Sequence, residues 1–100
     1  MARPPAGGVA TTTALTGSDQ AVLTGGGVFY GGAFYETGGD TATATVHDGT
    51  AAAGTVIAYI SLASGGVTNL SIPNGVQVIS GIYVDVGGSG TVAGSIFSTS

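Results

Sequence analysis

His47 and Asp48 are the one adjacent pair of side chains whose types could support hydrolysis, because His47 is the only histidine in the chain. A nucleophilic hydrolase needs a base that is oriented by an acid and placed beside a nucleophile. Neighbouring residues of a strand point to opposite faces, so Asp48 is poorly placed to orient His47. No strand-turn-helix elbow presents a serine, and the chain has no cysteine. We therefore predict no enzymatic activity and no catalytic residues, and we expect His47 to be exposed to solvent or in an interface. A hydrolase centred on His47 is kept as a third hypothesis, behind the two given at the end of this section.

The acidic side chains are the remaining groups that could do chemistry. They are Asp19, Glu36, Asp40, Asp48 and Asp85. Glu36 and Asp40 flank one glycine-rich loop, as the paired carboxylates of a glycosidase could. Together with Asp48 they are also the candidates for a calcium site, but the D-x-D-x-D-G spacing is absent. We favour structural roles, in which Asp40 bends the loop and Glu36 ends a strand, and we predict no metal site and no cofactor.

Few charges are available for binding. The 100 residues include one Lys or Arg, which is Arg3, and five acidic residues, so 6% are charged and the net charge is -4. An ordinary soluble domain has about 25% charged residues. Without lysine the chain cannot neutralise a row of phosphates or hold an anionic membrane, so we exclude nucleic acid and membranes as partners. Low charge also gives little protection against self-association, so we predict a subunit of a larger assembly.

The chain has the length of a single domain. We divide it into an extended N-terminal arm, residues 1–20, and a β domain, residues 21–100. Pro4-Pro5 favours extended polyproline geometry in the arm. The first residues contain no apolar h-region and no apolar run approaches the ~20 residues that span a bilayer. We therefore expect a protein made in the cytoplasm without a signal peptide.

Two segments show the alternation that positions side chains on a half-buried strand. Residues 41–46 read TATATV, which predicts a strand with its alanines and Val46 facing the core and its threonines facing outward. Residues 82–86 read IYVDV, which predicts a strand with the aliphatic residues inside and with Tyr83 and Asp85 outside.

The segment before the first of these strands is rich in aromatic residues. Residues 28–30 and 33–35 read VFY and AFY, and aromatic residues favour a pleated sheet. The glycines between them, Gly31 and Gly32, predict a bulge or a close backbone approach. Residues 36–40 predict a turn that joins antiparallel strands.

The later segments are expected to fold as follows. Residues 55–62 are apolar at both sets of alternating positions, which predicts a central strand covered on both sides. Residues 67–72 are an ambiguous strand that Pro73 should end, because proline cannot donate to a ladder. Asn74 and Gly75 then predict a tight turn.

These elements together predict an all-β fold. Seven or eight short strands separated by glycine turns, with no helix, indicate a single antiparallel β-sandwich with a jelly-roll-like topology. Sandwiches expose edge strands, which lysine or proline normally protects. Because this chain has no lysine, we expect neighbouring subunits to cover its edges.

Several segments resemble one known family. They are Gly32–Thr37 (GAFYET), Thr43–Thr50 (TATVHDGT), Pro73–Gly75 (PNG) and Gly81–Ile96. In these segments the chain resembles small virion structural proteins of tailed bacteriophages, particularly those that infect actinobacteria. The resemblance spans about three quarters of the chain. It implies a β-sandwich that serves as a capsid decoration or minor head protein, and it brings no catalytic residues with it.

The resemblance also implies the location and partners of the protein. The chain is expected on the outside of the capsid in the virion, bound to the major capsid protein and to copies of itself in a homo-oligomer, for which we name a trimer. The second hypothesis is a tail-fibre or receptor-binding module that binds carbohydrate, with tyrosine rings stacking on sugars. The interface candidates are Arg3, Pro4, Pro5, Leu15, Tyr30, Tyr35, Tyr59 and Tyr83.

Overall fold

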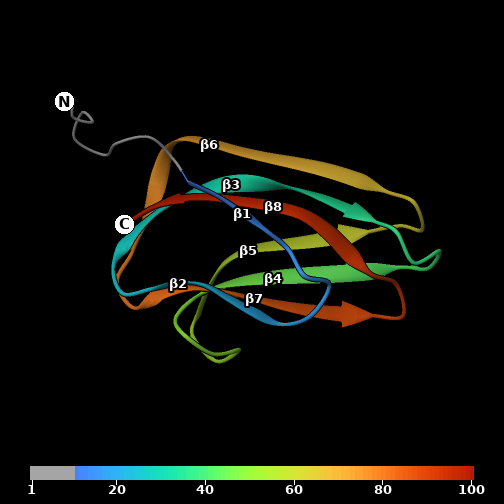
Figure 1. Ribbon diagram of the computed structural model, residues 1–100, viewed down its shortest axis with the longest axis horizontal. Helices are drawn as coiled ribbons and strands as arrows, with labels where there is room; N and C mark the ends of the chain where they lie inside the picture. The colour runs from blue at the N-terminus through green and yellow to red at the C-terminus, as the bar shows by residue number, and fades with distance from the viewer. Residues whose placement is uncertain (1–10) are drawn as a thin grey trace.

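The computed structural model describes residues 11–100, which fold into eight strands and no helix. The strands are β1 (Thr11–Ala14), β2 (Gln20–Thr24), β3 (Gly27–Glu36), β4 (Ala42–Asp48), β5 (Thr55–Leu62), β6 (Val67–Val78), β7 (Gly81–Gly88) and β8 (Val92–Thr99). They form two layers, with β1, β8, β3 and β6 above β2, β7, β4 and β5 in the view of Figure 1.

The strand order confirms the predicted antiparallel β-sandwich with jelly-roll topology. One sheet has the order β1-β8-β3-β6 and the other has the order β2-β7-β4-β5, and every pairing is antiparallel. Each strand of the first half pairs with its counterpart from the second half: β1 with β8, β2 with β7, β3 with β6 and β4 with β5. The first four strands therefore pair with the last four in reverse order, and the pairs are shared between two sheets. This is the arrangement of an eight-stranded jelly roll. We call the first sheet A and the second sheet B.

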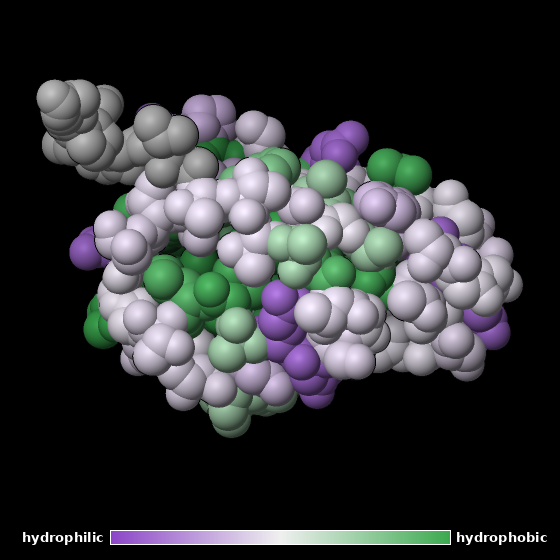
Figure 2. Space-filling model, viewed as in Figure 1, coloured by the Kyte–Doolittle hydropathy of each residue, from purple (hydrophilic) through white to green (hydrophobic). Residues whose placement is uncertain are grey.

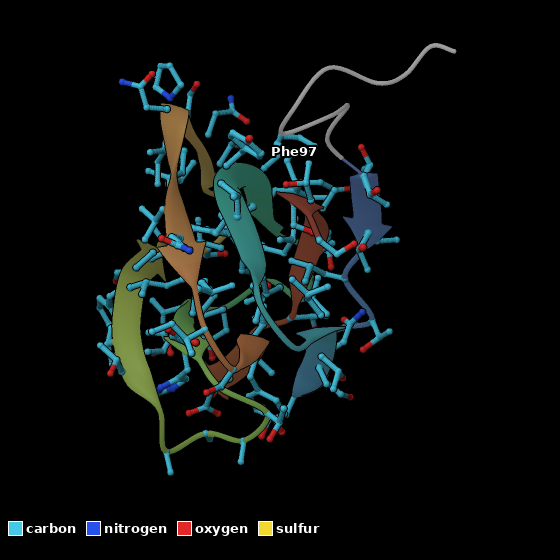
Figure 3. The ribbon with its side chains drawn as sticks, turned by 90° about the vertical axis from the view of Figure 1, so that its left-hand side faces the viewer. Phe97 is labelled. Carbon is cyan, nitrogen blue, oxygen red and sulfur yellow. The ribbon has the colours of Figure 1, made fainter. Side chains whose placement is uncertain are left out.

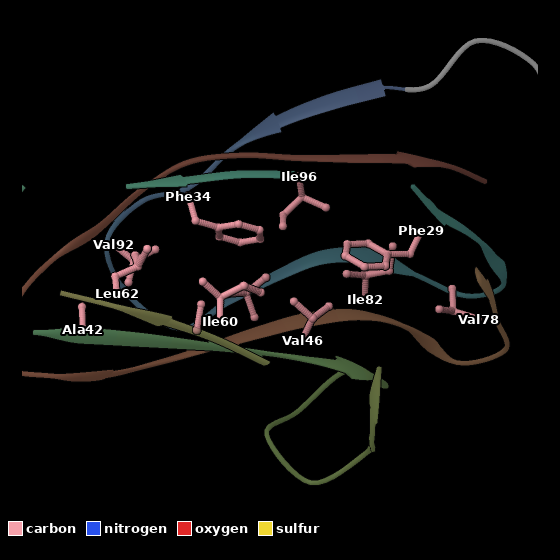
Figure 4. Packing of buried hydrophobic residues seen from close by; sticks show 12 residues of the cluster. Phe29, Phe34, Ala42, Val46, Ile60, Leu62, Val78, Ile82, Val92 and Ile96 are labelled. Carbon is pink, nitrogen blue, oxygen red and sulfur yellow. The ribbon is translucent and has the colours of Figure 1, made fainter. Parts of the chain in front are cut away.

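The hydrophobic core fills the space between the two sheets (Figure 4). Its side chains are Phe29, Phe34, Ala42, Ala44, Val46, Ile60, Leu62, Val78, Ile82, Val84, Val92 and Ile96. The alternation predicted for residues 41–46 and 82–86 is confirmed, since their alanines, Val46, Ile82 and Val84 are buried. Apolar burial of this kind contributes about 25 cal/mol per Å² and supplies most of the stability of a small sandwich.

Close backbone packing on both sides of β3 explains the glycines there. A register shift lies between Phe29 and Gly31 against both neighbouring strands, which confirms the predicted bulge. Gly31 has a φ of +110°, and a Cβ at this position would overlap the carbonyl of Leu70 on β6. Gly94 on β8 has a φ of +126°, and its Cβ would overlap the carbonyl of Ala33. Only glycine combines this φ with this clearance.

The boundary of the predicted N-terminal arm is wrong for residues 11–20. Thr11–Ala14 pairs with β8 of the same chain, from Thr11 opposite Ser98 to Ala14 opposite Ser95. Gln20 already belongs to β2. The sandwich therefore includes residues 11–20, because β8 offers them a ladder within the chain. The remainder of the predicted arm lies outside the described residues.

Three further expectations, one about a loop and two about strands, are wrong. The loop over residues 37–41 does not join paired strands, because β3 and β4 lie in different sheets. Strand β5 lies at the edge of sheet B, so its outer face is exposed and Tyr59 is 63% accessible. Strand β6 does not stop at Pro73 but continues to Val78. Pro73 is tolerated because β6 is an edge strand, and the ladder with β3 is interrupted between Ser71 and Val76.

Candidate functional site

A carboxylate at one end of the sandwich binds several loops at once. Glu36, the last residue of β3, is buried to 5% exposure. Its Oε1 accepts hydrogen bonds from the N–H groups of Gly39 at 3.0 Å and Gly65 at 2.9 Å. Its Oε2 accepts from Gly38 and from Thr91, the latter at 3.0 Å. One side chain thereby connects the β3–β4, β5–β6 and β7–β8 loops.

These backbone donors fix the ionisation state of Glu36. The N–H groups of Gly65 and Thr91, with smaller contributions from Gly38 and Gly39, lower the pKa of Glu36 from 4.5 to about 2, against the opposing effect of burial. A carboxylate that accepts several backbone hydrogen bonds is stabilised in its charged form. Glu36 thus remains an anion near neutral pH and is a poor general acid. Its position at the end of β3 confirms the predicted strand end.

A second carboxylate performs the same task at the other end. Asp48 ends β4, and its Oδ1 accepts from the N–H of Ser80 at 2.9 Å and from that of Ile79 at 3.1 Å. The N–H groups of Ser80 and Ile79 lower the pKa of Asp48 below its ordinary value. Asp48 thereby anchors the β6–β7 turn, with additional support from the Gly49 N–H bound to Gly81 O at 3.1 Å.

The expectation that His47 is exposed or lies in an interface is wrong for the single chain. His47 is only 7% exposed, and its Nδ1 lies 2.9 Å from the carbonyl oxygen of Gly54. The carbonyl can only accept, so Nδ1 carries a proton, and Nε2 is buried without a hydrogen-bond partner among the described residues. Because Asp48 binds the β6–β7 turn, the two neighbours do not form a catalytic dyad.

The residues considered for calcium do not come together. Glu36 and Asp48 lie at opposite ends of the sandwich, and Asp40 Oδ1 accepts from the N–H of Thr41 at 2.8 Å, as expected for a loop-bending residue. Within residues 11–100, no three His, Cys, Asp or Glu side chains are grouped closely enough to hold a metal ion. Asp19 also has a structural partner, since its Oδ1 accepts from the N–H of Val86 at 2.9 Å.

The predicted interface tyrosines lie on two opposite surfaces. Tyr30 and Tyr35 alternate with the buried phenylalanines of β3 and face outward from sheet A. Tyr59 and Tyr83 face outward from sheet B, where Thr45 lies between Tyr59 on β5 and Asp85 on β7. No surface carries all four rings.

The other predicted interface residues differ in position. Leu15 packs against the core, and its N–H donates to Gly94 O at 2.9 Å. Arg3, Pro4 and Pro5 lie outside the described residues. Phe97, which the sequence reasoning missed, alternates with the buried Ile96 and Ser98 and lies on the outer side of β8, opposite Gly31 (Figure 3).

Exposed apolar side chains occur on the two adjacent edge strands β5 and β6 and at Ile79, which we together call the β5–β6 side; Tyr59 faces outward from sheet B, whereas Val67 faces outward from sheet A. The large hydrophobic residues that are exposed are Tyr35 (43%), Val56 (55%), Tyr59 (63%), Val67 (65%) and Ile79 (79%). Four of them belong to the β5–β6 side, and Tyr35 is the register partner of Val67. Val56, Val67 and Ile79 were not among the interface residues predicted from the sequence.

Comparisons with known proteins identify no relative. The chain matches no protein-family model, and neither curated proteins nor solved structures give a match. Across residues 11–100, the structure has no helix that is long and apolar enough to cross a membrane.

Proposed function

We propose that this chain is a non-enzymatic structural subunit of a bacteriophage virion that binds the outside of the assembled capsid. The observation that carries the proposal is the β5–β6 side. Its two edge strands, β5 and β6, contain no charged residue, and four large apolar side chains are exposed there. Exposed apolar surface on a small domain is characteristic of interfaces. That the partner is a phage capsid is inferred from the resemblance to small virion proteins of tailed phages.

The polar groups of the sandwich support a structural role. The carboxylates of Glu36, Asp48 and Asp19 each accept hydrogen bonds from backbone groups distant in sequence, so they hold loops rather than face a substrate. The surface seen in Figure 2 is mostly of intermediate hydropathy, with few strongly hydrophilic patches. A subunit of this kind stabilises a shell through shape, apolar contact and strand edges, with ion pairs contributing little.

The direct test is binding to shells assembled from the major capsid protein alone. We expect purified chain to co-sediment with these shells in a saturable manner, and failure to bind under these conditions would contradict the proposal. A variant that lacks residues 2–10 tests the predicted arm while leaving β1 intact. We expect it to stay folded and to bind more weakly; binding equal to that of the full chain would contradict a role for the arm.

A carbohydrate-binding module is the second candidate, and one observation favours it. Tyr59 and Tyr83 share the outer face of sheet B with Thr45 and Asp85, which combines stacking surfaces with polar groups. The test is tyrosine fluorescence during titration with bacterial cell-wall glycans. A saturable change that disappears in Tyr59→Ala supports this module, and no change across the glycan panel rejects it.

A further inference from the structure

Two dipeptides of this chain have a sequence that can close into a cyclic imide. They are Asp48-Gly49 and Asn74-Gly75, in which a carboxylate or carboxamide side chain is followed by glycine. In this reaction the backbone nitrogen of the second residue attacks Cγ of the first, and glycine leaves the nitrogen accessible because it has no Cβ. Whether the ring can close in the folded chain depends on what holds these groups, and the two dipeptides differ there.

The fold holds both reacting groups of Asp48-Gly49. The carboxylate of Asp48 accepts hydrogen bonds from the N–H of Ser80 at 2.9 Å and from that of Ile79 at 3.1 Å. The N–H of Gly49 donates to the carbonyl oxygen of Gly81 at 3.1 Å. A carboxylate is also a poorer electrophile than an amide, because attack adds charge to an anion. Ring closure would break these hydrogen bonds, so we expect the folded chain to protect this dipeptide.

Asn74-Gly75 lies where the pairing of β6 is interrupted. The register of β6 with β3 runs to Ser71 and resumes at Val76, so neither Asn74 nor Gly75 has a partner in it. Strand β6 is also an edge of sheet A, so β3 is its one neighbour in the sheet of the described chain. The Asn74 side chain is exposed to solvent. The strand ladder therefore fixes neither the backbone nitrogen of Gly75 nor the residue whose side chain must swing toward it.

Glycine is required at position 75 by the packing of this interruption against β3. Gly75 has a φ of +72°, and a Cβ there would overlap Cγ1 of Val28 and lie 3.0 Å from Cε1 of Tyr30. Only glycine meets both conditions without strain. The fold thus keeps the least hindered of neighbours beside an exposed asparagine.

We propose that Asn74 is a site of spontaneous deamidation in the folded chain, whereas the fold protects Asp48-Gly49 from the same ring closure. A base such as hydroxide removes the proton of the Gly75 nitrogen, which attacks Cγ of Asn74. A C–N bond forms, and the side-chain NH2 group takes up a proton and leaves as ammonia to give a succinimide. Water then adds to either imide carbonyl and breaks its C–N bond, which yields aspartate or isoaspartate. The sum converts an amide and water into a carboxylic acid and ammonia, with no oxidation or reduction.

The product changes the charge of β6. This strand contains no charged residue, and the new side chain is a carboxylate near neutral pH. Deamidation therefore adds one negative charge to a chain whose net charge is -4. The reaction does not depend on the proposed function, because it involves only the chain and water.

The test compares the folded chain with the chain unfolded in guanidinium chloride, both in the same mildly alkaline buffer. Samples taken over time are digested with pepsin, because the chain has too few basic residues for trypsin. Mass spectrometry then measures the exchange of amide for carboxyl at Asn74 and locates isoaspartate. Asn69 is the internal control. It is exposed on the same strand, but a leucine follows it and it pairs in register with Ala33.

We expect Asn74 to convert in the folded chain at a native-to-unfolded rate ratio close to one, while Asn69 keeps its amide. Isoaspartate at Asp48 should be absent from the folded chain. An Asn74 that keeps its amide in the folded chain and converts in guanidinium chloride would overturn the inference. Isoaspartate at Asp48 that forms as fast in the folded chain as in guanidinium chloride would overturn the contrast between the two dipeptides.

Asn74→Gln gives a second readout, because glutamine would have to close a larger ring that forms more slowly. On anion exchange, aged wild type should gain a more acidic species that aged Asn74→Gln lacks. The same acidic species in both proteins would place the reaction elsewhere and overturn the assignment to Asn74.

Discussion

Glu36 and Asp48 end the consecutive strands β3 and β4 and anchor the loops at opposite ends of the sandwich. Glu36 binds backbone groups 29 and 55 residues away in the sequence, and Asp48 binds groups 31 and 32 residues away. Because a jelly roll has many non-local contacts, its loops need fixed positions. A carboxylate at each end meets this need with one side chain.

Glu36→Gln tests the first of these anchors. The carboxamide has nearly the shape of the carboxylate, but it turns one acceptor into a donor that meets the N–H groups of the loops. We expect the melting temperature at pH 7 to fall by several degrees while the β spectrum is kept. Asp40→Asn is the control, because within residues 11–100 the Asp40 side chain bonds only to its neighbour Thr41. Equal melting temperatures for Glu36→Gln and wild type would show that the anchor contributes nothing.

Stability should depend on pH in the acidic range. The pKa of Glu36 is lowered from 4.5 to about 2, and that of Asp48 is lowered too, so the folded chain binds these protons less readily than the unfolded chain. The stabilisation is complete above pH 4.5 and is lost as the pH falls towards 2. Melting temperatures measured from pH 6 to pH 2 should therefore converge for wild type and Glu36→Gln. A difference that stays constant down to pH 2 would contradict this assignment.

Gly94→Ala tests the close approach of β8 to β3. The added Cβ would overlap the carbonyl of Ala33 at a φ of +126°, so we expect a loss of about 3 kcal/mol or more in unfolding free energy. Gly39→Ala is the matched control, since Gly39 also has a positive φ, +83°, but has open space around its Cα. Its cost should be about 1–2 kcal/mol. Chemical denaturation gives both values, and similar losses would argue against the close approach.

Phe34→Ala and Phe97→Ala compare the two faces of sheet A. Phe34 is fully buried between the sheets, so its truncation should cost about 3–5 kcal/mol in unfolding free energy. Phe97 lies on the outer face and is partly exposed, so its truncation should cost at least about 1 kcal/mol less. Urea denaturation of both variants measures the difference. A larger loss for Phe97→Ala would mean that the outer face of sheet A is more important to the fold than its burial indicates.

Much of the fold was predictable because alternation is a local property. The runs at 41–46 and 82–86 carry their core-facing residues at every second position, and glycine turns mark most strand ends. Sheet membership is not local, however. The apolar run at 55–62 reads as a central strand, yet β5 is an edge strand whose exposed apolar residues remain uncovered in the single chain. Pro73 likewise predicts the end of a strand, but β6 continues past it because an edge strand tolerates a proline.

The candidate sites were harder to predict for the same reason. Glu36 was placed correctly at a strand end, but its partners at Gly65 and Thr91 come from separate loops that only the folded topology brings together. His47 was expected to be exposed or in an interface, because the sequence alone does not show that its ring is buried and bonded to the carbonyl of Gly54. The β5–β6 side had one detectable signal in the sequence, the absence of charge from residue 49 to residue 84.

The central claim is that this chain is a regular subunit of a virion. The most direct test is its copy number in purified virions, measured by quantitative mass spectrometry against the major capsid protein. We predict a simple whole-number ratio to the shell lattice, as expected of a capsid-bound subunit. A handful of copies per particle would contradict the capsid position, and complete absence from the particles would contradict the virion role itself.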